Sequence, residues 1–199
     1  MRLLILGDSS AAGVGAGHQS EALAGQLASF LAEKHRIHWK LVAKSGATVG
    51  STLHQIQALE PTYYDFVIIA LGVNDAKNGV RVKRWQDGYR ALLTTLSDSF
   101  GRPLICASGV PHLRDFPLLP KPLNSVLGDR SETFDAVLRD VVEGFDNVFH
   151  VPLTFPPDPS MLAADGFHPS PKTYREWARR AAGGFLKAAS GSDPALGSD

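Results

Sequence analysis

Two short polar motifs at opposite ends of this chain together hold the residue types needed for nucleophilic catalysis. GDSS, which contains Ser9, directly follows an apolar run, and DGFH contains Asp165 and His168. A serine hydroxyl is a weak nucleophile at neutral pH, so it needs a histidine to accept its proton and a carboxylate to orient that histidine. DGFH supplies both groups. The sequence therefore predicts a reactive serine at position 9.

Other residues could stabilise the negative charge that such a reaction creates on a carbonyl oxygen. Asn74, in the motif GVND, offers a side-chain amide, Ser9 offers its own backbone N–H, and a glycine in KSGATVG offers another N–H that no side chain obstructs. Taken singly, each motif is also compatible with an ordinary turn, loop or helix cap. Their combination favours acyl-transfer chemistry.

The elements that must position these motifs alternate between strand and helix. Apolar runs suited to buried strands recur at spacings too wide for hairpins; they are Leu3–Leu6, Trp39–Val42, Phe66–Leu71, Leu104–Ala107 and Val148–Val151. Apolar residues at helical spacing lie around 23–31, 53–59, 85–96 and 134–142. A last helix follows Ser170, which can cap it, and Pro171, which suits its first turn.

This alternation predicts an α/β fold, a three-layer α/β/α sandwich around a parallel sheet of about five strands. Ligands in such sheets bind beyond the carboxyl ends of the strands, where the polar motifs fall. We expect one domain over residues 1–188 and a flexible tail over residues 189–199. We expect residues 109–130 to be irregular because they are rich in proline.

The proline-rich stretch 109–130 also carries apolar residues that could contact a substrate. It follows the fourth predicted strand, so it should lie on the same side of the sheet as the motifs. Its apolar side chains could line an acyl pocket or could pack as a structural flap; they are Phe116, Leu118, Leu119 and Leu123. We favour the pocket because loops of this length usually serve a function.

Composition argues against several other function classes. Twenty basic residues balance twenty acidic ones, so no net charge attracts nucleic acid or an anionic membrane. Cys106, the only cysteine, lies in an apolar run and is expected in the core, and the histidines lack zinc-binding spacing. The glycine-rich run 13–17 lacks a phosphate-loop lysine. We predict no metal or other cofactor, no membrane insertion, and a cytoplasmic protein that acts on a small molecule.

The ordered motifs resemble the SGNH hydrolases, also called the GDSL esterases and lipases. GDSS matches the first block of that family, GVND the third and DGFH the last. The resemblance implies a flavodoxin-like fold and a catalytic triad of Ser9, His168 and Asp165. It also implies an oxyanion hole formed by the Ser9 and Gly46 backbone amides and the Asn74 side chain.

The chain departs from the family pattern at two places. Ser10 stands where the family usually has leucine, which should matter little because the reacting hydroxyl precedes it. The asparagine that usually comes shortly before the oxyanion glycine is absent from residues 43–45. We choose Gly46 because SGAT matches the small-Gly-x-Thr signature of the family, and Gly50 is the alternative.

The resemblance implies a carboxylic ester hydrolase that forms an acyl-enzyme on Ser9. We expect small soluble esters with short to medium acyl chains. Thioesters, lysophospholipids and acetylated sugars remain alternatives, as does transfer to an acceptor other than water, because one constellation serves all of them. A protein that only binds an acylated partner is disfavoured, since the nucleophile, base and charge-stabilising donors are all present.

Overall fold

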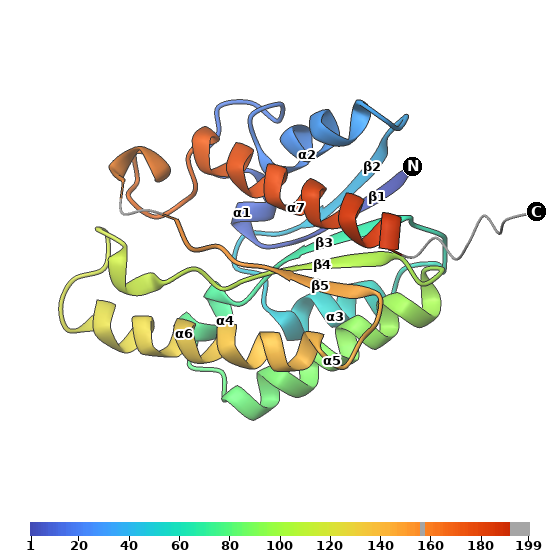
Figure 1. Cartoon of the computed structure of the whole chain (residues 1–199). Coiled ribbons are helices and arrows are strands. Elements are labelled where there is room, and N and C mark those ends of the chain that lie inside the picture. Colours follow the sequence, from blue (N-terminus) through green and yellow to red (C-terminus); the bar gives the residue numbers. More distant parts are fainter. Residues whose placement is uncertain (156–157, 192–199) are drawn as a thin grey trace, which may run out of the picture.

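Five parallel strands form the central sheet in the computed structural model, which describes residues 1–155 and 158–191 (Figure 1). The strands are β1 (Arg2–Gly7), β2 (His38–Ala43), β3 (Phe66–Ala70), β4 (Leu104–Ser108) and β5 (Val148–Val151). They pair in the order β2-β1-β3-β4-β5. This is the flavodoxin-like order, in which ligands bind where the connections diverge from β1 and β3. The predicted α/β fold is confirmed.

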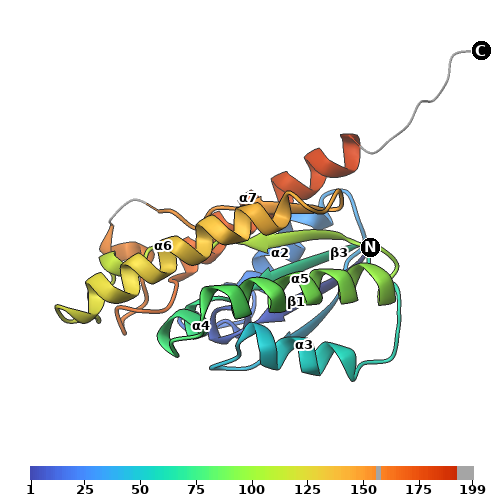
Figure 2. The ribbon, with the colours of Figure 1, turned by 90° about the horizontal axis from the view of Figure 1, so that it is seen from below.

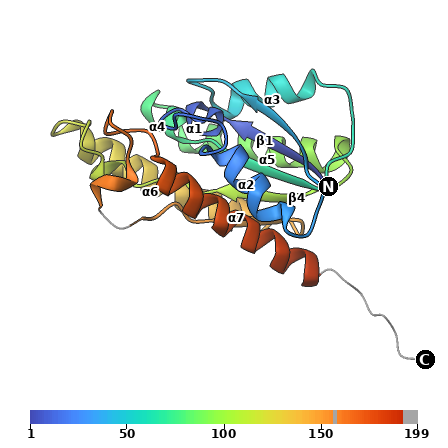
Figure 3. The same cartoon turned by 90° about the horizontal axis from the view of Figure 1, so that it is seen from above.

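Helices cover both faces of the sheet. The lower face in Figure 1 carries α3 (Val49–Gln57), α5 (Val82–Ser99) and α6 (Leu123–Val142), which are in front in Figure 2. The upper face carries α2 (Leu23–Ala32) and α7 (Pro171–Gly191), which lie side by side in Figure 3. Alternating side chains of each strand feed two cores: Leu4 and Leu6 pack on the lower one, Leu3 and Ile5 on the upper one.

Helix α7 ends at Gly191, three residues beyond the boundary expected at residue 188. Ser170 begins it as expected, since its Oγ accepts the N–H of Thr173 at 3.4 Å. Residues 192–199 of the expected tail lie outside the described residues. Cys106 is fully buried in the upper core, in keeping with its apolar surroundings in the sequence.

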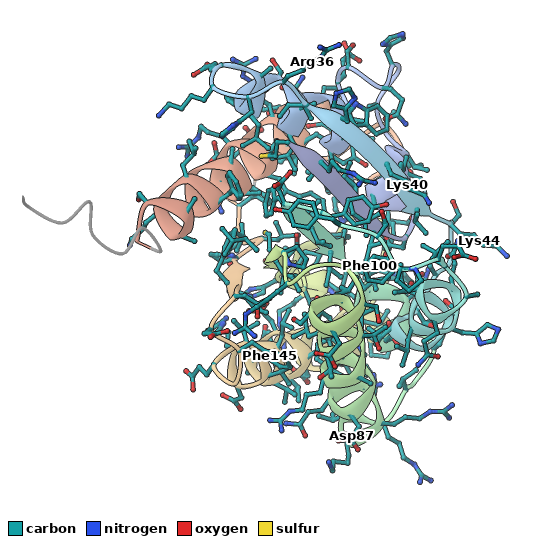
Figure 4. The ribbon with its side chains drawn as sticks, turned by 90° about the vertical axis from the view of Figure 1, so that its right-hand side faces the viewer. Arg36, Lys40, Lys44, Asp87, Phe100 and Phe145 are labelled. Carbon is teal, nitrogen blue, oxygen red and sulfur yellow. The ribbon has the colours of Figure 1, made fainter. Side chains whose placement is uncertain are left out.

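Strand β2 forms one edge of the sheet and carries exposed side chains. Figure 4 looks from the end where the strands begin and shows Lys40 on this strand and Lys44 just after it. Both lysines are exposed, as is His38. Charged side chains on an edge strand disfavour pairing with a strand of another molecule.

The prediction that residues 109–130 are irregular is wrong for the last eight of them. After a short turn η1 (Leu113–Asp115), helix α6 begins at Leu123 and continues without interruption to Val142. Every proline of the stretch precedes Leu123, and Pro122 is the N-cap residue of α6. No later residue therefore lacks the N–H that helical hydrogen bonding requires.

A buried carboxylate on α6 holds the loop that follows β4. Asp135 Oδ1 accepts the N–H of Val110 at 2.9 Å and lies 2.9 Å from His150 Nε2 on β5, while Arg139 donates to Oδ2. Burial raises the pKa of Asp135, but the hydrogen bonds from His150 and Arg139 outweigh it and lower the pKa to about 2. The contact should therefore stabilise the fold fully above about pH 4 and less as the pH falls toward 2.

Replacing Asp135 with alanine should lower the free energy of unfolding by about 3 kcal/mol at pH 7, because it leaves buried partners unpaired. Urea unfolding at pH 7 and pH 3 checks this, and the difference from wild type should shrink at pH 3. Asp140→Ala, an exposed acid on the same helix, is the control and should change little. An equal difference at both pH values would contradict this account of Asp135.

Candidate active site

Strand β1 delivers Ser9 to the carboxyl end of the sheet. Asp8 ends the strand region and caps the short helix α1 (Ser9–Ala12), with its Oδ1 accepting the N–H of Ser10 at 2.9 Å. Ser9 is therefore the first helical residue, and N–H groups at that position have no acceptor within their own helix. The GDSS motif after the first strand is therefore the start of one helical turn, which places the Ser9 hydroxyl beside His168.

His168 bridges Ser9 and Asp165. Its Nε2 lies 3.0 Å from Ser9 Oγ, and its Nδ1 lies 2.5 Å from Asp165 Oδ2. The other oxygen, Asp165 Oδ1, accepts the N–H groups of Phe167 and His168, each at 2.9 Å. These hydrogen bonds, above all the one from the His168 ring, lower the pKa of Asp165 to about 2 and keep it ionised at neutral pH. The structure thus brings together the three residues that the sequence motifs singled out.

The segment that carries His168 is closed on itself and packs on the first loop. Leu162 and Pro169 form an antiparallel bridge, and the N–H of Ala163 donates to the His168 carbonyl oxygen at 2.8 Å. Gly15 approaches the segment with a φ of +100°, and a Cβ there would collide with the Pro169 carbonyl oxygen. The glycine-rich run therefore serves close packing at this site.

Gly46 lies in the turn between β2 and α3. The N–H of Ala47 donates to the Lys44 carbonyl oxygen at 2.9 Å, and Gly46 has a φ of +80°, as the third residue of a type II turn requires. Gly46 lines the same cleft as Ser9 and Asn74. The alternative, Gly50, is the second residue of α3 and is not among the residues that line the cleft.

Asn74 belongs to α4 (Val73–Lys77), the short helix that follows β3. It is 9% exposed, and its Nδ2 donates to Asp8 Oδ2 at 3.2 Å and to the Ala47 carbonyl oxygen at 3.1 Å. Burial raises the pKa of Asp8. Asp8 and the neighbouring Asp75 are buried carboxylates beside the predicted oxyanion donors, and the sequence motifs did not reveal these contacts.

A cleft of about 680 Å³ opens at the carboxyl ends of the strands. The loops after β4 and β5 surround it, at the left of Figure 1. Phe116, Leu118 and Leu119 line it as expected, whereas Leu123, the first residue of α6, does not. Further apolar residues in the lining were not predicted; they include Val73, Leu153, Phe155, Met161, Leu162 and Phe167. For Val73, Leu153 and Phe155 the signal in the sequence was their place within four residues of the end of β3 or β5.

The family model of the GDSL-like lipase/acylhydrolase family matches residues 5–176, a stretch that contains all three polar motifs. The chain belongs to this family. Membership supports an ester hydrolase and confirms the family predicted from the motifs. No curated protein sequence matches this GDSL-like hydrolase. Among the described residues, no helix of the hydrolase is both long and apolar enough to span a membrane.

Solved structures share the fold of this GDSL-like hydrolase. A carbohydrate esterase family 2 enzyme with a carbohydrate-binding domain from Corynascus thermopiles (Myceliophthora fergusii) is 17% identical, with a TM-score of 0.75 over 95% of this chain and 66% of that chain. TesA is 22% identical, with a TM-score of 0.71 over 94% and 98%. Esterase EstA from Pseudoalteromonas sp. is 23% identical, with a TM-score of 0.68 over 94% and 98%. At these identities the likeness shows the fold alone.

Proposed function

We propose that this protein is a serine hydrolase that cleaves carboxylic esters through an acyl-enzyme on Ser9. The observation that carries the proposal is the hydrogen-bonded line from the Ser9 hydroxyl through the His168 ring to the Asp165 carboxylate. With its proton on Nδ1, the His168 ring donates to Asp165 and leaves Nε2 free to accept the proton of Ser9.

In the first half of the reaction, Ser9 Oγ attacks the ester carbonyl carbon while His168 Nε2 takes the hydroxyl proton. Negative charge develops on the carbonyl oxygen, where the N–H groups of Ser9 and Gly46 would stabilise it. The Asn74 amide joins them by turning one of its two hydrogens, which contact Asp8 and Ala47 in the free protein, toward that oxygen. The intermediate then collapses, the bond to the alcohol oxygen breaks, and His168 returns the proton to the departing alcohol. The acyl group remains on Ser9.

In the second half, water replaces the alcohol. His168 takes a proton from water, the resulting hydroxyl attacks the acyl carbon, and the proton returns to Ser9 Oγ as the carboxylic acid leaves. Asp165, with a pKa of about 2, stays ionised throughout and stabilises the imidazolium that forms twice per cycle. This scheme requires no metal or cofactor.

The cleft supports a substrate with a short to medium acyl chain. Its volume of about 680 Å³ lies within the roughly 300–1,000 Å³ of small-molecule sites. Phe116 and Phe167 meet edge to face with ring centroids 5.4 Å apart and form an apolar wall beside His168. Such a wall favours an alkyl chain over a hydroxyl-rich sugar, whose polar groups would lose hydrogen bonds there.

Covalent labelling tests the proposal directly. A serine-reactive fluorophosphonate should modify the protein once, and peptide mass spectrometry should place the adduct on Ser9. Turnover of p-nitrophenyl butyrate should disappear in proportion to labelling. Absence of an adduct on Ser9 in folded protein would refute the enzyme assignment, and a product that forms only with an acceptor alcohol or sugar would favour a transferase.

Replacing Phe116 with alanine should shorten the range of acyl chains that are cleaved. We expect kcat/KM for p-nitrophenyl octanoate to fall about tenfold, because the variant loses apolar contact with the distal chain, while the acetate ester changes little. A chain-length series from acetate to decanoate measures this. Leu123→Ala, which lies outside the cleft, is the matched control. Equal losses for acetate and octanoate would contradict the proposed acyl wall. A strong preference of the wild type for acyl-CoA or acetylated sugars would contradict the proposed substrate class.

A further inference from the structure

Two consecutive residues of α4 hold the loop that carries Gly46. The Asn74 amide donates to the Ala47 carbonyl oxygen at 3.1 Å. The N–H of Val49 donates to both carboxylate oxygens of Asp75, at 3.1 and 3.3 Å. These contacts lie just after Gly46 in the chain, so the turn is attached to α4 at the point where it enters α3.

Asp75 is buried in a place that disfavours a charge. Asp75 is 2% exposed and is not among the residues that line the cleft. Burial raises the pKa of Asp75 to about 6, the charge of Asp8 adds to this rise, and the Val49 N–H opposes it. An apolar side chain could fill the site without the cost of desolvating a carboxylate. The carboxylate therefore points to a role other than stability.

Asp8 makes the corresponding contact on the other side of Asn74. Its Oδ1 accepts the N–H of Ser10, and its Oδ2 accepts from the Asn74 amide. Asp8 thus ties the Ser9 segment to α4, while Asp75 ties the Gly46 segment to the same helix. All three predicted oxyanion donors are held relative to one another through α4.

We propose that Asp75 is a positioning residue for the oxyanion hole, because its hydrogen bond from Val49 fixes the Gly46 turn beside Asn74. The inference rests on the proposed ester hydrolysis at Ser9. Asp75 does not contact the cleft, so its loss should leave substrate binding intact. Loss of Asp75 should instead weaken the hydrogen bond from the Gly46 N–H to the carbonyl oxygen of the substrate, which forms as negative charge develops on that oxygen. The expected signature is a lower kcat with little change in KM.

Two substitutions of Asp75 test the hydrogen bond. Asp75→Ala removes the acceptor and should lower kcat for p-nitrophenyl butyrate by about 10- to 100-fold, with KM nearly unchanged. Asp75→Asn keeps an oxygen for the Val49 N–H and should restore most of kcat. A trifluoromethyl ketone inhibitor, which forms a tetrahedral oxyanion adduct on a serine, should lose affinity for Asp75→Ala by about the same factor as kcat.

Val49→Pro tests the same hydrogen bond by removing its donor, and it replaces Asp75→Ala in the test if that variant does not fold. Val49 is the first residue of α3, where proline is well tolerated, and Thr48 before it is already extended, with φ −114° and ψ 167°. The substitution removes the N–H and keeps Asp75, and it also exchanges the Val49 side chain, which is buried in the lower core, for a proline ring. We expect a loss of kcat similar to that of Asp75→Ala.

Ser51→Ala is the matched control for the start of α3. Ser51 Oγ accepts the Thr48 N–H at 2.9 Å as part of the capping box of α3. This contact lies within one segment and does not connect the Gly46 turn to α4. This variant should unfold at a lower temperature and keep a kcat close to wild type. Circular dichroism establishes that each variant is folded.

Three results would overturn the inference. They are an unchanged kcat in Asp75→Ala and Val49→Pro, a rise in KM that matches the fall in kcat, and an Asp75→Asn variant as slow as Asp75→Ala. Labelling of wild-type Ser9 by the fluorophosphonate distinguishes this failure from failure of the proposed function. An unlabelled and inactive wild type would overturn both proposals, whereas an active one whose Asp75 variants behave normally would overturn this inference alone.

Discussion

Replacing Ser9 with alanine should lower kcat for p-nitrophenyl butyrate by at least about 10⁴-fold, because the variant has no oxygen to form the acyl-enzyme. The base, its carboxylate and the oxyanion donors all remain, so a small residual rate above that in water should persist. The hydroxyl contacts His168 at the cleft rather than the core, so the unfolding temperature should change little. Steady-state kinetics and thermal unfolding of the purified variant measure both quantities.

Ser10→Ala is the control for this prediction. Ser10 contacts Asp8 through its backbone N–H and its side chain, and alanine retains the backbone N–H that caps α1. The neighbouring variant should therefore keep most of its activity and should still be labelled at Ser9. If Ser9→Ala kept substantial activity, or if Ser10→Ala lost as much, the assignment of the nucleophile would be wrong.

Replacing Asp165 with asparagine should lower kcat by about 10⁴-fold with little change in KM. In the proposed mechanism the carboxylate accepts the Nδ1 proton of His168, which leaves Nε2 as the acceptor for the Ser9 proton. An asparagine amide can donate to Nδ1 instead and so stabilise the tautomer in which Nε2 already carries a proton. It also lacks the negative charge that stabilises the imidazolium.

The kcat of Asp165→Asn across a pH series, together with its rate of labelling at Ser9, measures this effect. Labelling should slow in parallel with turnover, since both need a deprotonated Ser9 oxygen. Asp129→Asn, an exposed acid paired with Arg114 away from the cleft, is the control and should behave as wild type. Rapid labelling of Asp165→Asn would contradict the role given to the carboxylate.

The strands could be predicted because a parallel sheet covered on both faces leaves a plain signal. Leu3 to Leu6 are all fully buried, two on each face, so the strand reads as an uninterrupted apolar run. The same topology explains why Ser9 and Asn74 meet. Ser9 follows β1 and Asn74 follows β3, which are neighbouring inner strands. The carboxyl ends of parallel strands lie on the same side of the sheet, so motifs that are far apart in sequence come together there.

Other features left no such signal. The first turns of α6 were obscured by the prolines before Leu123, although none lies within the helix. The helices α1 and α4 are too short to show a helical period, so their sequences indicated only turns. The contacts of Asp8 with Asn74 and of Asp75 with Val49 join residues 66 and 26 positions apart, and no local pattern records such pairs.

His168 stands 159 residues after Ser9, on a small closed loop just before α7. The proposed nucleophile and oxyanion donors follow β1, β2 and β3, whereas the proposed base directly precedes α7, which is synthesised after all five strands. A folding intermediate with the sheet formed but α7 undocked would have its serine in place and no proton acceptor beside it. Ester turnover would therefore report the docking of α7 on the sheet, because a chain with α7 undocked would lack the proton acceptor for Ser9.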